Sequence, residues 1–119
     1  MVVIRTFDIG GDKQIADLYY CTGQNPALGV RGVRRHLLLR PSEIQTQLRA
    51  ILRAAVGFPV GILFPMITTV DDIREVKRLL ESVKEELRAE DKLFSKEVEL
   101  GAMIEVPAAA IVSAISWRR

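Results

Sequence analysis

Short apolar runs alternate with longer segments of helical periodicity, and this alternation constrains the fold more than any other feature of the chain. The apolar runs are VVIRTF at residues 2–7, VGILFPM at 60–66 and VELGAMIEV at 98–106. Continuous apolar and β-branched character is typical of strands that are covered on both faces. Three such strands with helices between them predict an α/β fold, in which βαβ units build a parallel sheet.

The helical segments carry their own start signals. Thr69 stands three residues before Asp72 in a capping-box arrangement, and apolar residues then recur on one face as far as Leu87. A second amphipathic helix is expected between Pro41, which suits a first helical position, and Gly57.

Two further helices are expected, with weaker hydrophobic periodicity than the first two. Pro107 opens a helix after the last apolar run. The connection that follows the first strand has weak periodicity, with a turn at Asn25 and Pro26 and a short helix expected to start near Leu28.

The composition limits the classes of function. With 119 residues the chain suits one domain, residues 1–119, and 17 basic against 15 acidic residues give a net charge of only +2. That balance requires neither nucleic acid nor an anionic membrane as a partner. One cysteine and one histidine allow no internal disulfide and no Cys/His zinc site. No signal peptide or membrane-spanning run is present, so a cytoplasmic location is expected.

Parallel sheets bind ligands at the carboxyl ends of their strands, which here are residues 8–13, 66–68 and 105–108. Arg5 lies in the first strand, Arg31 and Arg34 follow in the connection, and Glu105 ends the third strand. Guanidinium groups that converge on one rim suit a phosphorylated, acidic small molecule. A carboxylate beside them suits Mg²⁺ bridging that phosphate.

Each candidate also has a structural alternative. Arg5 can pair with Asp8 or Asp12, and Glu105 can cap the helix that follows it. Taken one at a time, motif spacing favours these alternatives.

The remaining conspicuous side chains suit structural roles as well. Arg34 and Arg35 can lie on a helix surface, His36 is expected to pack or to face solvent, and Cys21 has no histidine predicted beside it. No catalytic residue is therefore assigned.

In combination the motifs are more specific. RTFDIGGDK, NPALGVRGVR, QLRAILRAA, ILFPMI and GAMIEVPAAA occur in this order over nearly the whole chain. The chain resembles Enzyme I of the bacterial phosphoenolpyruvate-dependent sugar phosphotransferase system, in its C-terminal domain. The resemblance implies part of a TIM (β/α)₈ barrel that binds phosphoenolpyruvate and Mg²⁺.

The resemblance also assigns roles to residues. It implies that Arg5 and Arg31 bind the phosphate of phosphoenolpyruvate and that Glu105 is a ligand of Mg²⁺. Arg34 has a weaker claim to the ligand, and Asp8 and Lys13 are expected to shape the loop or to act behind the ligand-binding residues.

A complete barrel of this type takes about 250 residues. The family's GTNDL metal-binding motif and its GMCGE-like segment with the catalytic cysteine do not occur in this sequence. We therefore expect about three βα units, the third to fifth of the barrel, without independent turnover.

The unpaired sheet edges of such a fragment predict a homo-oligomer. Two alternatives remain: a fragment of phosphoenolpyruvate synthase or pyruvate phosphate dikinase, and a non-enzymatic module that acts on full-length Enzyme I.

Overall fold

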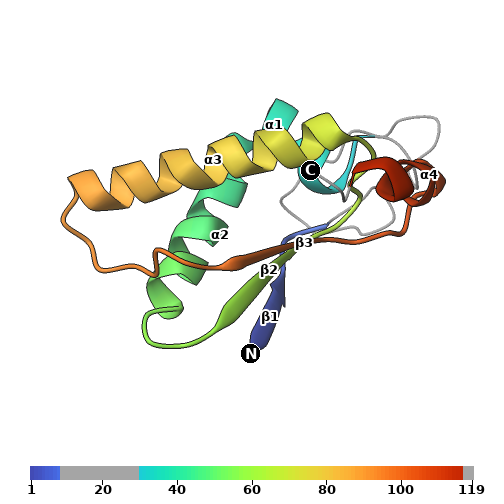
Figure 1. Ribbon diagram of the computed structural model, residues 1–119. Helices are drawn as coiled ribbons and strands as arrows, with labels where there is room; N and C mark the ends of the chain where they lie inside the picture. The colour runs from blue at the N-terminus through green and yellow to red at the C-terminus, as the bar shows by residue number, and fades with distance from the viewer. Residues whose placement is uncertain (9–29, 117–119) are drawn as a thin grey trace.

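The computed structural model describes residues 1–8 and 30–116, and within α1 and α4 the side chains of residues 35, 36, 112 and 114–116 are not described. Strands and helices alternate along the described chain, apart from two successive helices between the first two strands (Figure 1). In order, the elements are β1 (Val2–Arg5), α1 (Gly32–Leu39), α2 (Pro41–Ala54), β2 (Val60–Phe64), α3 (Val70–Ala89), β3 (Glu99–Ala102) and α4 (Pro107–Ser116).

The three strands form one parallel sheet in the order β1-β2-β3, which confirms the predicted α/β class and the parallel pairing. Arg5 lies opposite Leu63, and Leu63 lies opposite Gly101, so the strands run in register to a common carboxyl edge. This arrangement is consistent with part of a βα barrel, although the described residues do not form a complete one.

All three strands are shorter than the apolar runs that predicted them. β2 ends at Phe64 because Pro65 and Met66 form a turn in which Met66 has a positive φ of 58°. β3 ends at Ala102, after which the N–H of Met103 still donates to the Phe64 carbonyl oxygen at 2.9 Å. The residues beyond each strand therefore belong to the carboxyl-edge loops, where ligand-binding side chains are expected.

The predicted helix signals are confirmed. The Thr69 hydroxyl accepts the Asp72 N–H while the Asp72 carboxylate accepts the Thr69 N–H, which completes the capping box of α3. Pro41 occupies the first turn of α2. The short helix expected near Leu28 begins, in the described chain, at Gly32, and the predicted turn at Asn25 and Pro26 lies outside the described residues.

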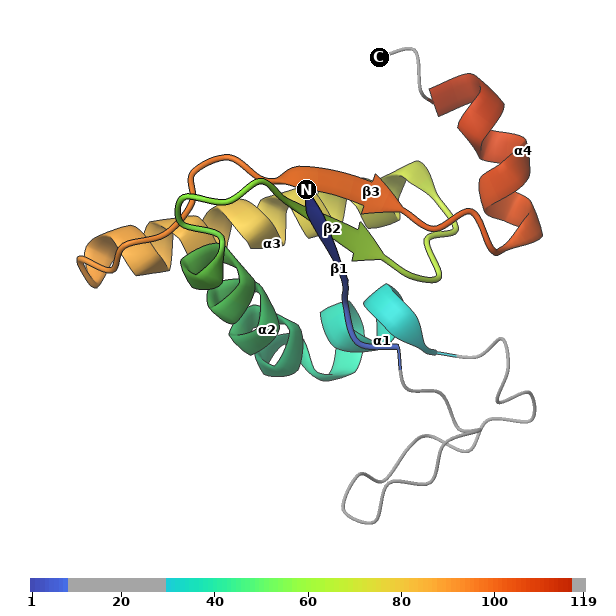
Figure 2. The ribbon, with the colours of Figure 1, turned by 90° about the horizontal axis from the view of Figure 1, so that it is seen from below.

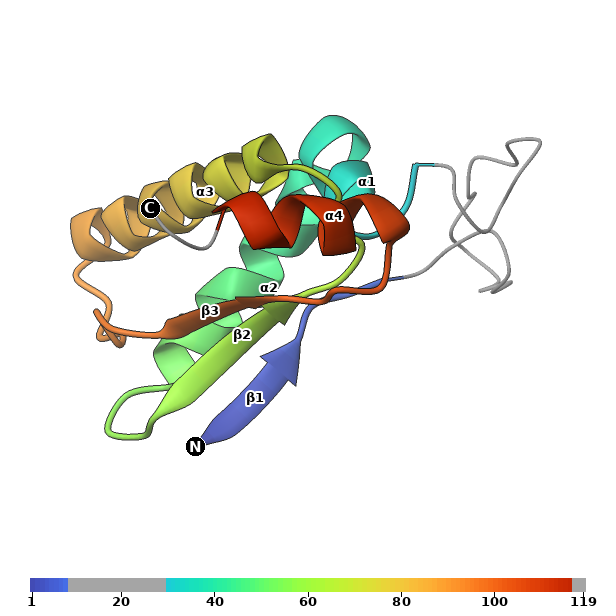
Figure 3. The same ribbon diagram turned by 45° about the vertical axis from the view of Figure 1, so that its right-hand side comes forward.

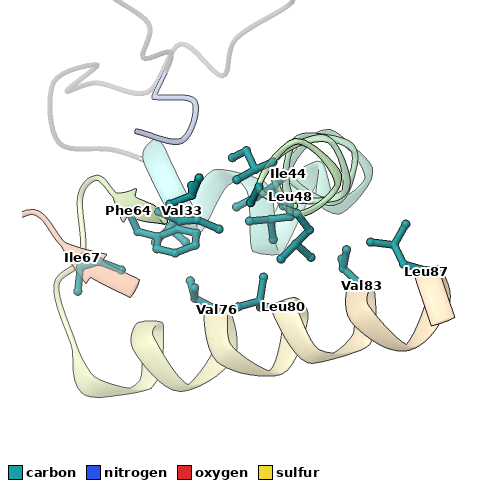
Figure 4. Close-up of a cluster of buried hydrophobic side chains, with 14 residues drawn as sticks. Val33, Ile44, Leu48, Phe64, Ile67, Val76, Leu80, Val83 and Leu87 are labelled. Atoms are coloured by element: carbon teal, nitrogen blue, oxygen red, sulfur yellow. The ribbon is translucent and has the colours of Figure 1, made fainter. Parts of the chain in front are cut away.

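The core lies between the sheet and the helices α1, α2 and α3 (Figure 4). Its members are buried apolar side chains at helical spacing on α2 and α3, joined by alternate residues of β2. They are Val33, Ile44, Leu48, Ile51, Leu52, Ala55, Val60, Ile62, Phe64, Ile67, Val76, Leu80, Val83 and Leu87.

Helices α2 and α3 lie on one side of the sheet, and the strands stand in front of them in Figure 3. On the open side of the sheet Gly61 and Gly101 leave little side-chain bulk, and Val3 beside Gly61 is largely exposed. Helix α4 lies beyond the carboxyl end of β3, apart from α2 and α3 (Figure 2). Among the described residues no helix is long and apolar enough to cross a membrane.

Candidate functional site

Two arginines from different elements meet on one carboxylate at the carboxyl edge of the sheet. Arg31 donates from Nε to Asp8 Oδ1 at 3.1 Å and from Nη2 to Asp8 Oδ2 at 3.0 Å. Arg5 donates from Nη2 to the same Oδ2 at 2.9 Å. Arg5 is the last residue of β1, and Arg31 directly precedes α1. We call Arg5, Asp8 and Arg31 the arginine cluster.

The three side chains of the arginine cluster differ in their exposure to solvent. The side chain of Asp8 is only 3% exposed, that of Arg31 is 16% exposed and that of Arg5 is 43% exposed. The three residues of the cluster carry two positive charges and one negative charge, and Glu105 adds a second carboxylate at the same edge. Partly exposed guanidinium N–H groups attract an anion from solvent.

Arg5 also reaches toward the third strand. Its Nε donates to Sδ of Met103 at 3.1 Å, two residues before Glu105. No partner of Arg5 Nη1 is found among the described residues.

Glu105 follows β3 and is exposed, and its carboxylate binds the neighbouring strand end. Oε1 of Glu105 accepts the backbone N–H of Met66 at 2.8 Å. In the described part of the chain this bond, rather than a cap of α4, is the polar contact of the carboxylate. A hydrogen bond to one oxygen orients a carboxylate while its second oxygen can accept another ligand.

Gly32 links the two halves of the edge. A Cβ on Gly32 would lie 2.7 Å from Cβ of Met66 and 3.2 Å from the Pro65 carbonyl oxygen, so only glycine allows this approach. Because Gly32 follows Arg31 and Met66 donates to Glu105, the start of α1, the turn after β2 and the carboxylate after β3 form one continuous set of contacts.

Arg34 takes a different partner from the arginine cluster. It donates to Asp72 from Nε at 3.3 Å and from Nη2 at 3.5 Å, which ties α1 to the N-terminus of α3. Burial by itself raises the pKa of Asp72. Hydrogen bonds from the Thr68 and Thr69 N–H groups, and then Arg34, outweigh that effect and hold the pKa below its ordinary value. Arg34 thus has a structural role here.

The described side chains alone supply few ligands for a metal ion. In residues 1–8 and 30–116 no group of three or more His, Cys, Asp or Glu side chains could hold a metal ion. Glu105 supplies one carboxylate. That donor set fits Mg²⁺ only where a bound phosphate and water complete the coordination, as Mg²⁺ commonly requires.

Sequence reasoning and structure agree on part of this site. The structure brings Arg5 and Arg31 together and places Glu105 on the same edge, joined to them through Met66 and Gly32. The pairing of Arg5 with Asp8, which was predicted as a structural alternative, is also present. The Arg5 side chain nevertheless remains 43% exposed to solvent.

The sharing of Asp8 by both arginines was not predicted. The close spacing of Arg5 and Asp8 in sequence was the available signal, but it says nothing of Arg31. Asp12, Lys13 and Cys21 lie outside the described residues, as do the side chains of Arg35 and His36.

The chain is similar to known proteins over nearly its whole length. Residues 1–116 match the family model described as PEP-utilising enzyme, PEP-binding domain. The chain is 44% identical to phosphoenolpyruvate-protein phosphotransferase of Haemophilus influenzae over 93% of its length, and 43% identical to that of Priestia megaterium over 94%. The protein of the same name from Staphylococcus aureus is 44% identical over 94% of the chain. In each case the chain spans only 19% of the relative's length.

Proposed function

The chain belongs to the PEP-utilising enzymes, within their PEP-binding domain, and on this premise we propose that it binds phosphoenolpyruvate as a piece of a phosphoenolpyruvate-protein phosphotransferase. The observation that carries the proposal is the arginine cluster. It puts two guanidinium groups at the carboxyl edge of a parallel sheet, where ligands bind.

In this proposal Arg5 and Arg31 bind the phosphate group. Arg5 is the more exposed of the two and has Nη1 available, so it meets the anion from the solvent side. Arg31 is mostly buried and supplies a fixed charge behind it. Guanidinium groups suit this role because their planar N–H donors match phosphate oxygens and stay charged.

Glu105 binds Mg²⁺ in the same proposal. The Met66 N–H binds one carboxylate oxygen, and the other oxygen would bind the ion. When bound, the ion would neutralise phosphate charge and bridge the ligand to the protein. The single carboxylate supports weak metal binding by the protein alone and stronger binding in the presence of the ligand.

We propose binding without independent phosphoryl transfer. The relatives that carry the full name are about five times longer, since this chain covers 19% of them. In this proposal the described residues supply groups that bind and orient a phosphorylated anion.

Isothermal titration calorimetry tests this function directly. Phosphoenolpyruvate is titrated into the 119-residue chain with and without Mg²⁺, and millimolar or tighter binding that strengthens with Mg²⁺ is expected. Glu105→Gln keeps an oxygen for the Met66 N–H but removes the charge. It should retain binding without Mg²⁺ and lose the enhancement by Mg²⁺. Absence of any binding by the unsubstituted chain at 10 mM would contradict the proposal.

We also propose that copies of the chain self-associate through the β1 edge of the sheet. β1 has a partner strand on one side, and Val2 and Val3 are 60% and 55% exposed. An exposed apolar edge strand pairs readily with another strand. Light scattering at micromolar concentration should give more than the monomer mass of 13.3 kDa, and Val3→Lys should shift the mass toward monomer. A monomeric unsubstituted chain would rule this out.

A further inference from the structure

We propose that Asp8 is a positioning residue that orients Arg5 and Arg31 for an anionic ligand, an inference that rests on the phosphate-binding function proposed above. The simpler view is that Asp8 only neutralises the two arginines and competes with the ligand. The two views predict opposite effects of removing its charge.

The hydrogen-bond geometry favours positioning. Arg31 binds Asp8 through Nε and Nη2, a side-on bidentate pair that fixes the plane of the guanidinium group. Arg5 binds the same Oδ2 from the end of β1. Asp8 therefore contacts both cations and holds them beside each other, although they would repel each other in its absence.

Burial points in the same direction. The Asp8 side chain is 3% exposed and lies beneath arginines that are 16% and 43% exposed. A ligand that displaced Asp8 would leave its carboxylate buried and unpaired, which is strongly unfavourable. The anion therefore binds beside Asp8, on the outward side of the arginines, and does not replace it.

The cluster also fixes the loop around it. Thr6, between Arg5 and Asp8, is 2% exposed, and its N–H donates to the Leu63 carbonyl oxygen at 3.0 Å. The backbone two residues before Asp8 is thus bound to β2, and the Phe7 N–H donates to Oε1 of Gln47 at 3.0 Å, so the carboxylate has little freedom to follow a shifted arginine. Orientation then depends on the length of this side chain as well as on its charge.

Two substitutions separate the two views. Asp8→Asn removes the charge at nearly constant size, and Asp8→Glu keeps the charge on a longer side chain. Under positioning, both variants bind phosphoenolpyruvate at least about tenfold more weakly, the scale expected for loss of a charge-assisted hydrogen bond. If Asp8 were only a competing counter-ion, Asp8→Asn would bind more tightly and Asp8→Glu would match the unsubstituted chain. Either of those results would overturn the proposal.

Asp71→Asn is the matched control. Asp71 is 80% exposed on the first turn of α3, where it pairs with Arg74 rather than with the arginine cluster. It changes the net charge by the same amount as Asp8→Asn. Its affinity for phosphoenolpyruvate should stay within about twofold of the unsubstituted chain, consistent with the small energies of exposed ion pairs.

A measurement without ligand makes the test independent of the proposed function and of the folding of the variants. In ¹⁵N-resolved NMR of the unsubstituted chain, the Nε–H signals of Arg5 and Arg31 should be ordered, and rotation about the Nε–Cζ bond of Arg31 should be slow. Free rotation of Arg31 would overturn the positioning role. If the ordered signals are present in the unsubstituted chain and lost in Asp8→Asn, but phosphoenolpyruvate does not bind, the proposed function fails and the orientation by Asp8 stands.

Discussion

Gly32 and Met66 both adopt left-handed backbone conformations, with φ of 57° and 58°, at the point where α1 meets the turn after β2. A Cβ on Gly32 would come within 2.7 Å of Cβ of Met66. The two residues thus hold Arg31 and Glu105 on one edge, since Gly32 directly follows Arg31 and the Met66 N–H donates to Glu105.

Gly32→Ala should therefore destabilise the fold. The substitution adds left-handed strain and a clash with backbone and Cβ atoms, together about 2–4 kcal/mol of unfolding free energy. Urea unfolding followed by circular dichroism measures the loss. Gly57→Ala is the control, because Gly57 also has a positive φ of 81° but nothing lies within 4 Å of its added Cβ. It should cost only the strain, about 1 kcal/mol, and equal losses in the two variants would refute the steric role of Gly32.

Arg31→Gln and Arg34→Gln form a matched pair. Each removes an arginine that binds an aspartate, but only Arg31 belongs to the arginine cluster. We expect Arg31→Gln to weaken phosphoenolpyruvate binding at least about tenfold and Arg34→Gln to change it less than about threefold. Calorimetric titration decides, and a larger loss in Arg34→Gln would transfer the binding role to Arg34.

The stability of the chain should fall in acid partly through Asp72. Its pKa in the folded state is depressed below the ordinary value of 3.8, so its ionised form contributes stability above about pH 4. That contribution is lost as the pH falls through the lower pKa of the folded state. The difference in unfolding free energy between the unsubstituted chain and Asp72→Asn should be largest near pH 7 and should shrink below pH 4. Urea unfolding from pH 7 to pH 3 measures it, and a constant difference would contradict the assignment.

Thr6→Val should be neutral or stabilising. Oγ1 of Thr6 is buried and has no hydrogen-bond partner in the described structure, so the hydroxyl contributes desolvation cost without a bond. Valine has nearly the same shape, and a gain of up to about 1 kcal/mol in unfolding free energy is expected. Thr69→Val is the contrast, because the Thr69 hydroxyl caps α3 and its removal should cost about 1 kcal/mol. A loss of that size in Thr6→Val as well would show that its hydroxyl has a partner.

Local signals predicted the helices well. The Thr69 capping box and the proline at the start of α2 act within a few residues, and both are present in the structure. The strand ends were predicted less accurately. The left-handed turn at Met66 depends on contacts with Gly32 and Glu105, which lie far away in sequence.

The candidate site shows the same division. Arg5, Arg31 and Glu105 were recognisable from their motifs and from the carboxyl-edge rule for parallel sheets. Their partners were not all recognisable, since the Arg31 to Asp8 and Arg34 to Asp72 pairs depend on how α1 lies against the end of β1 and the start of α3. Pairing between distant segments is a property of packing, and no spacing in the sequence encodes it.

The parallel register of β1 has a consequence for how this edge is assembled. Val2 pairs with Val60, so joining β1 to β2 closes a segment of the chain that includes α1 and α2. Closing so long a segment is entropically costly, whereas α3 can form from local contacts. We therefore expect Arg5 and Asp8 to reach Arg31 late in folding. An anion bound by both arginines should stabilise the pairing of β1, so the amide hydrogens of β1 should exchange with solvent more slowly when it is present.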